Sequence, residues 1–148
     1  MHAAYLRAAL MEFVGMEDCL PGDLRRLGQK RAALRMYDTG NAMLIMLREL
    51  RHVHVHVGCA RTIRAEREAI IRSRNRDDVE TTVDVITVPR SDLEQLRDAR
   101  HSKRFQSGEL LAAIEWLDEA QGQWGIRDVV VSAVNEWARE ILRAHGAG

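Results

Sequence analysis

Hydrophobic residues in the first part of the chain recur every three to four positions, as they do on one face of an α-helix. This spacing predicts helices over residues 3–17, 24–37 and 42–57. The string Leu20-Pro21-Gly22-Asp23 is predicted to break the first helix, with Asp23 capping the second. Asn41 suits the N-cap of the third helix, and Gly58 suits the position that follows its C-terminus.

The pattern changes from helical period to alternation in the middle of the chain. Residues 79–88 are rich in β-branched side chains and alternate valine with threonine and aspartate, which predicts a β-strand. Residues 61–71 suit either a strand or a helix, and a polar turn at 73–78 joins the two segments. The simplest arrangement is an antiparallel hairpin. Because two strands alone are marginal in water, the hairpin is expected to pack on the helices or to pair with another chain.

The helical period returns after Pro89, which is predicted to end the strand. Ser91 and Glu94 have the spacing of a capping box for a helix that reaches about residue 100. Further helices are predicted from Ser107 to the glycines at 122 and 125, and over residues 127–144. The sum is a mainly α fold, an up-and-down helical bundle with an inserted β-hairpin around residues 61–88, in a single domain of residues 1–148.

Composition narrows the classes of function. Net charge is zero and aromatics make up 5% of the chain, which argues against a strongly basic nucleic-acid binder and against a stacking platform for single strands. No apolar run approaches the ~20 residues that span a bilayer, so no membrane partner is expected. Two cysteines and no signal peptide predict reduced thiols in a cytoplasmic protein. The three tryptophans are expected to be core or interface anchors.

Most of the candidate chemistry lies in residues 48–57, Arg-Glu-Leu-Arg-His-Val-His-Val-His-Val. Histidine exchanges its proton near neutral pH, and arginine can clamp a phosphate through two hydrogen bonds. As a helix, the segment places Arg48, His52 and His56 on one side with Arg51 beside them, opposite a stripe of methionine, leucine and valine.

If the same segment forms a strand, its histidines are arranged differently. All three imidazoles, including His54, would then share one face in a metal-site pattern. The helix is favoured, because the helical period begins at Asn41 and continues without a break. No cofactor and no metal ion are expected.

The arginines are unevenly distributed despite the neutral total. From Arg48 to Arg76 there are eight arginines against three acids. Arg48, Arg61 and Arg64 are therefore candidates for binding phosphate or RNA. The alternative is that these arginines only solvate the hairpin surface.

Arg51 and His56, with the polar residue His52 directly after the arginine, form an Arg-x4-His signature. On a helix of a small α-bundle, this signature resembles that of the HEPN superfamily (higher eukaryotes and prokaryotes nucleotide-binding domains). The resemblance covers residues 1–58 and the C-terminal helices, with residues 60–90 as an elaboration. One branch of the family has a tyrosine two residues after the histidine, where this chain has Gly58, so chemistry attached to that tyrosine is not expected.

The resemblance implies a metal-independent endoribonuclease that acts as a homodimer, with RNA as substrate. Arg51 would hold the scissile phosphate, His56 would transfer the proton and His52 would orient the site. Two alternatives remain open. One is a non-catalytic dimeric binding or regulatory module, such as a toxin–antitoxin or defence component, with an antitoxin or another protein as partner. The other is a metal-binding protein built on the histidine cluster.

Overall fold

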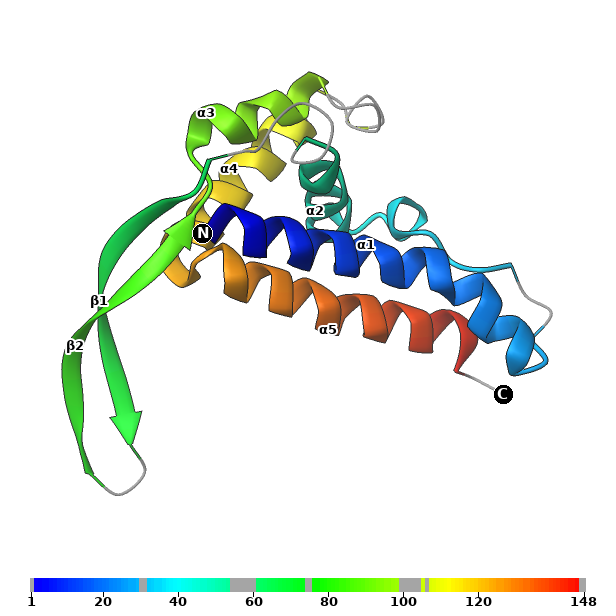
Figure 1. Cartoon of the computed structure of the whole chain (residues 1–148), viewed down its shortest axis with the longest axis horizontal. Coiled ribbons are helices and arrows are strands. Elements are labelled where there is room, and N and C mark those ends of the chain that lie inside the picture. Colours follow the sequence, from blue (N-terminus) through cyan, green and yellow to red (C-terminus); the bar gives the residue numbers. More distant parts are fainter. Residues whose placement is uncertain are drawn as a thin grey trace.

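The computed structural model describes residues 2–29, 32–53, 61–73, 76–98, 105 and 107–146. Its elements in chain order are α1 (His2–Arg26), the 3-10 turn η1 (Met36–Asp38), α2 (Ala42–His52), β1 (Ile63–Ser73), β2 (Arg76–Thr87), α3 (Arg90–Leu93), the 3-10 turn η3 (Glu94–Asp98), α4 (Ser107–Trp124) and α5 (Ile126–His145). The predicted mainly α fold with an inserted hairpin is confirmed. The long helices α1 and α5 lie side by side and run in the same direction (Figure 1).

The core is built around α2, which packs against α1, α4 and α5. Leu44, Leu47 and Leu50 of α2 are fully buried, and Trp137 of α5 is buried with them. Asn41 caps α2 as predicted, because its side-chain oxygen accepts hydrogen bonds from the amides of Met43 and Leu44. Within the described residues, no helix is both long enough and apolar enough to cross a bilayer.

The predicted break of the first helix at residues 20–23 is wrong. Pro21 lies inside α1, where its ring removes the N–H that would donate to the carbonyl of Glu17. Leu20 and Leu24 on either side of it are buried in the core. Their packing offsets the cost of an internal proline, so the helix continues to Arg26. Asp23 is consequently a residue within α1 and not the cap of a second helix.

The predicted helix over residues 24–37 is also wrong. Gly28 ends α1 with φ 71°, a left-handed conformation that glycine adopts at low cost. The amide of Gly28 donates to the carbonyl of Arg25, and the amide of Gln29 donates to that of Leu24, which together form a Schellman motif. Residues 32–35 are not helical, and the chain re-enters the core at Met36, which is fully buried.

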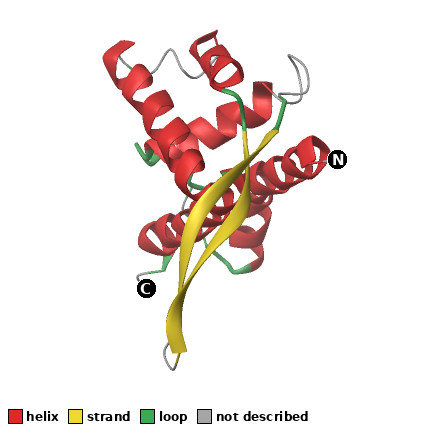
Figure 2. Cartoon of the chain, turned by 90° about the vertical axis from the view of Figure 1, so that its left-hand side faces the viewer, coloured by secondary structure: helices red, strands yellow, loops and turns green. Residues whose placement is uncertain are grey.

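The hairpin is confirmed, and residues 61–71 fall mostly in its first strand rather than in a helix. The strands are antiparallel, with Ile63 opposite Thr87 and Ile71 opposite Val79. Both strands extend into the turn predicted at 73–78, since β1 reaches Ser73 and β2 begins at Arg76. The twisted pair projects away from the helices (Figure 2).

The base of the hairpin is fixed to the corner between α4 and α5. The side-chain amide of buried Gln121 donates to the Val88 carbonyl at 2.7 Å and accepts from the Val88 amide at 2.8 Å. Gly125 separates the two helices with φ 81°, and a Cβ there would lie 3.4 Å from the Cβ of Val85. Arg67 Nε donates to the Gly122 carbonyl at 2.8 Å. The hairpin therefore leaves the helical body at a defined angle.

The segment after the hairpin differs from its prediction, while the last two helices follow theirs. A capping box at Ser91 is wrong, because the helix begins at Arg90 with Pro89 at its N-cap and passes into η3 at Glu94. The Asp92 carboxylate accepts from Ser91 in its own helix and from Arg61, which lies just before β1. The predicted helices over the last forty or so residues are confirmed as α4 and α5, divided at Gly125.

Candidate functional site

The C-terminal half of α2 carries the residues that the sequence singled out. The helix is described through His52, with Val53 at its C-cap, so the helical interpretation of this part is confirmed. Met46, Leu50 and Val53 are buried on the predicted apolar stripe, while Arg48, Arg51 and His52 are each half-buried. Residues 54–60 lie outside the described part of the chain. Accordingly the roles of His54, His56 and Gly58 stay predictions.

Arg48 belongs to an ion-pair network inside the helical body. Its Nε donates to Glu17 Oε2 at 2.8 Å, and its Nη1 lies 3.7 Å from Glu49 Oε1. The guanidinium also stands 4.7 Å from the centroid of the Tyr37 ring. Glu17 is fully buried and Glu49 is 1% exposed, so these carboxylates are screened little by water. Arg48 therefore links α2 to α1 and η1.

The network was not predicted from the sequence, although Glu17 leaves a signal there. Glu17 follows Leu10 and Phe13 and precedes Leu20 and Leu24 at helical spacing, so it occupies the apolar stripe of α1. A glutamate in such a stripe requires a cation once the helix is packed. The structure supplies Arg48 and, at 3.5 Å, the Nη1 atom of Arg35.

Arg51 lies about one turn beyond Arg48 on α2, and the hydrogen bonding of its Nε differs from that of Arg48. Its Nε is buried and has no hydrogen-bond partner among the described residues. A buried donor without an acceptor costs about 1–3 kcal/mol, so such groups are uncommon in folded proteins. The neighbouring His52 is half-buried and already makes an interaction of its own. Within the described residues, Arg51 is thus the arginine of α2 with a buried donor that has no acceptor.

Arg61 and Arg64 lie on the hairpin arm and are each matched to a carboxylate. The Arg61 amide donates to Asp92 Oδ2 at 2.7 Å, and its guanidinium donates to Oδ1 at 3.2 Å. Burial acts to raise the pKa of Asp92, but the hydrogen bonds from Arg61 and Ser91 outweigh it and hold that pKa below its usual value. Arg64 pairs across the strands with Asp84, and this hydrogen bond lowers the pKa of Asp84.

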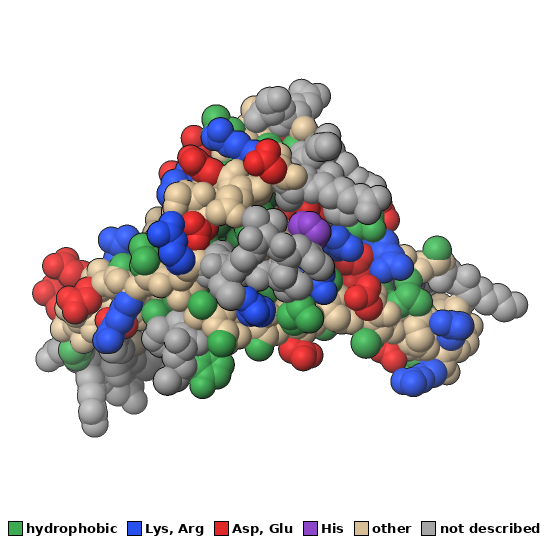
Figure 3. All heavy atoms as spheres, turned by 45° about the horizontal axis from the view of Figure 1, so that its top comes forward, with side chains coloured by type: hydrophobic (Ala, Val, Ile, Leu, Met, Phe, Trp, Pro, Cys, Tyr) green, Lys and Arg blue, Asp and Glu red, His purple; other side chains and the backbone are tan. Residues whose placement is uncertain are grey.

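The arginines predicted to bind phosphate therefore do not form one free cationic patch. Each of Arg48, Arg61 and Arg64 contacts a carboxylate, and Arg48 lies in α2 whereas Arg61 and Arg64 lie on the hairpin arm. Acidic and basic side chains are interspersed over the face that Figure 3 shows. Within the described ranges, no three His, Cys, Asp or Glu side chains are close enough to hold a metal ion.

The side chains at the C-terminal end of α2 are of the types that bind phosphate and transfer protons. A guanidinium with a free donor can bind a phosphate oxygen, and an imidazole within reach of the same phosphate can transfer a proton. Comparisons with protein families, with curated proteins and with solved structures find no match to this chain. The resemblance to the HEPN superfamily consequently rests on the residues of the motif alone.

Proposed function

We propose that this chain is a metal-independent endoribonuclease of HEPN type, which acts as a cytoplasmic homodimer. Arg51 holds the scissile phosphate, His56 moves the proton between the ribose 2′-oxygen and the leaving 5′-oxygen, and His52 orients the site. The observation that carries the proposal is the buried Nε of Arg51, which has no partner among the described residues. A phosphate oxygen is the acceptor that would satisfy it.

The contrast between Arg48 and Arg51 supports this assignment. Both are half-buried on the same helix, but Arg48 is neutralised by Glu17 and Glu49. A phosphate approaching Arg48 would have to displace a fully buried carboxylate. Arg51 has no such partner to displace within the described part of the chain, so it is the arginine that we assign to the phosphate.

The test is cleavage of a mixed RNA pool in EDTA by the wild type and by the variants Arg51→Ala and His56→Ala. EDTA-resistant cleavage that is lost in both variants supports the proposal. Arg26→Ala is the matched control, because Arg26 is a surface arginine that pairs with Asp23 in its own helix, and this variant should cleave as the wild type does. Circular dichroism of every variant separates a lost site from a lost fold.

A second candidate is a non-catalytic dimeric binding module. It is favoured by the pairing of Arg48, Arg61 and Arg64 with carboxylates, since these arginines then serve the fold and not a substrate. A wild type that elutes as a dimer but cleaves no RNA would support the module and overturn the ribonuclease. Cleavage that EDTA abolishes would overturn both and return attention to a metal bound by the histidines.

A further inference from the structure

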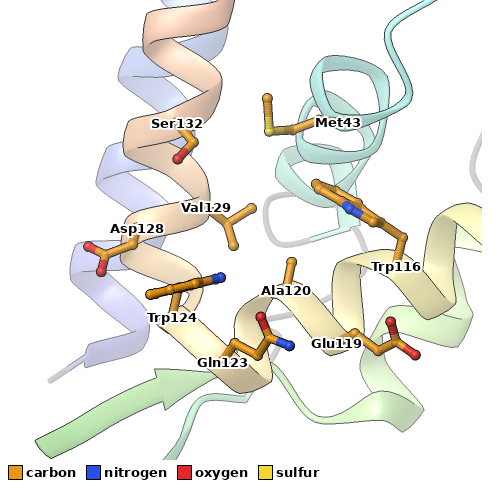
Figure 4. A pocket seen from close by; sticks show the side chains of 9 residues that line it. All are labelled: Met43, Trp116, Glu119, Ala120, Gln123, Trp124, Asp128, Val129 and Ser132. Carbon is orange, nitrogen blue, oxygen red and sulfur yellow. The ribbon is translucent and has the colours of Figure 1, made fainter. Parts of the chain in front are cut away.

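Two of the three tryptophans are exposed, and they border the same hollow. Trp137 is fully buried in the core, whereas Trp116 is 41% exposed and Trp124 is 65% exposed. Both belong to α4, and Figure 4 shows their indoles on opposite sides of a cavity of about 430 Å³. Exposing two such large apolar rings is unfavourable unless another molecule covers them.

The floor of this cavity is apolar, and its rim is acidic. Ala120 of α4 and Val129 of α5 lie between the indoles, and Met43 of α2 lies at the upper end of the cavity in Figure 4. The exposed carboxylates of Glu119 and Asp128 stand at the outer sides, and the structure gives neither of them an ion pair within its described residues. An indole face attracts a cation, and a carboxylate beside it adds to that attraction.

The hollow continues past Trp124 toward the hairpin. A second, larger depression shares Glu119, Gln123, Trp124 and Asp128 with the first and extends along β1 and β2. The charged residues that line the two are five acids, Glu68, Asp84, Asp118, Glu119 and Asp128, and two arginines, Arg67 and Arg127. Two of the acids are already paired with arginines outside the lining, Asp84 with Arg64 and Asp118 with Arg90. Arg67 already donates to the Gly122 carbonyl. The acidic part of the surface is the first hollow, whose described lining includes Glu119 and Asp128 and no lysine or arginine. The two hollows together are longer than a small ammonium ion requires.

We infer that this surface binds a basic, amphipathic peptide segment of a partner protein. One lysine or arginine of the segment lies between the indoles of Trp116 and Trp124, with the carboxylates of Glu119 and Asp128 on the two outer sides of the cavity. Apolar side chains of the segment cover Met43 and Val129, and the remainder of it follows the depression toward the hairpin. RNA is the less suitable occupant, although its bases stack on tryptophan, because its phosphates would face the carboxylates of Glu119 and Asp128.

The experiment measures binding of two capped octapeptides by calorimetry at low salt. One alternates leucine and arginine, and the other alternates leucine and glutamate. Decauridine is the third probe. The wild type should bind the arginine peptide alone, with an affinity that falls as salt is added. Trp116→Ala and Trp124→Ala should each weaken binding about threefold to fivefold, the size of a part-exposed cation–π contact.

Matched controls isolate the surface from general effects. Glu119→Gln combined with Asp128→Asn should weaken binding and reduce its dependence on salt. Glu115→Gln removes a charge from an exposed position of α4 outside the cavity lining, and should bind as the wild type does. Leu142→Ala truncates an exposed apolar residue of α5 and should do the same. Both controls also report on the fold of their helices.

Several results would overturn the inference. The wild type binding neither peptide, or binding both equally, would remove the charge argument. Unchanged affinity in both tryptophan variants would move the peptide to another surface. Decauridine that binds more tightly than the arginine peptide, and is lost with the tryptophans, would make this an RNA surface instead.

Discussion

Replacing Arg48 and Arg51 separately by methionine should change stability in different ways. Methionine keeps much of the length of arginine and removes its charge. Arg48→Met leaves Glu17 fully buried, with Arg35 at 3.5 Å as its remaining cation. Breaking one side of a buried pair costs about 3–5 kcal/mol, and the remaining Arg35 places this case near 3 kcal/mol. Arg51→Met instead removes a buried donor that lacks a partner within the described residues.

We therefore expect Arg51→Met to range from neutral to about 2 kcal/mol more stable, because the cost of an unsatisfied donor disappears. The assay is urea unfolding followed by circular dichroism, with unchanged m-values required for the comparison. Arg26→Met, at an exposed position of α1, should stay within about 0.5 kcal/mol of the wild type. The reasoning is refuted if Arg48→Met costs less than about 1 kcal/mol, or if Arg51→Met costs as much as Arg48→Met.

Three further predictions test the cap, the hairpin anchor and the pH dependence. Asn41→Ala should cost about 1 kcal/mol in urea unfolding, because the amides of α2 lose their cap, and an unchanged midpoint would contradict the cap. Gln121→Leu leaves the buried Val88 amide and carbonyl unpaired, so it should cost at least about 2 kcal/mol and speed hydrogen exchange in β2. The pKa of Asp92 is lowered in the folded state, so its contribution is present above the unfolded aspartate pKa of about 3.9 and is lost as pH falls through the folded value. Asp92→Asn should accordingly flatten the acid limb of a plot of urea midpoint against pH, and an unaltered limb would place the acid sensitivity elsewhere.

The parts of the fold that the sequence predicted correctly depend on local signals. The apolar stripe of α2 and the cap at Asn41 are properties of adjacent residues, and the structure has both. The alternation over residues 79–88 likewise fixes which side chains share a face of β2. Val85 and Thr87 lie on the same face and are buried at the base of the hairpin.

The wrong helix boundaries have tertiary causes. Pro21 is a local signal to stop, but Leu20 and Leu24 pack into the core on both sides of it, and this packing outweighs the signal. Gly28 is the residue that ends α1, whereas a helix over residues 24–37 would have needed Leu27 on its buried face. Leu27 is in fact 76% exposed, so it contributes little to any buried face.

The ion pairing of Arg48, Arg61 and Arg64 could not be predicted, because their carboxylate partners are distant in sequence. Glu17 precedes Arg48 by 31 positions, and Asp92 follows Arg61 by the same separation. A count of charges along residues 48–76 predicts a cationic patch, because it leaves out the carboxylates that neutralise these arginines from other segments. Those carboxylates belong to α1, β2 and α3. Glu17 is the exception, because its place within an apolar stripe of the sequence indicates that it needs a cation as partner.

Arg48 and Arg51 together offer a way to tell a functional charge from a structural one. A buried charge whose partner is part of the fold is maintained by stability, so its loss lowers stability whatever the protein does. A buried donor without a partner lowers stability for as long as it is kept, and we propose that at Arg51 a bound phosphate offsets this cost. If Arg51→Met stabilises the chain and also abolishes RNA cleavage, both effects have one cause, the unsatisfied Nε. If it stabilises the chain and the wild type cleaves no RNA, the unsatisfied Nε is only a cost to the fold, and the non-catalytic binding module becomes the favoured function.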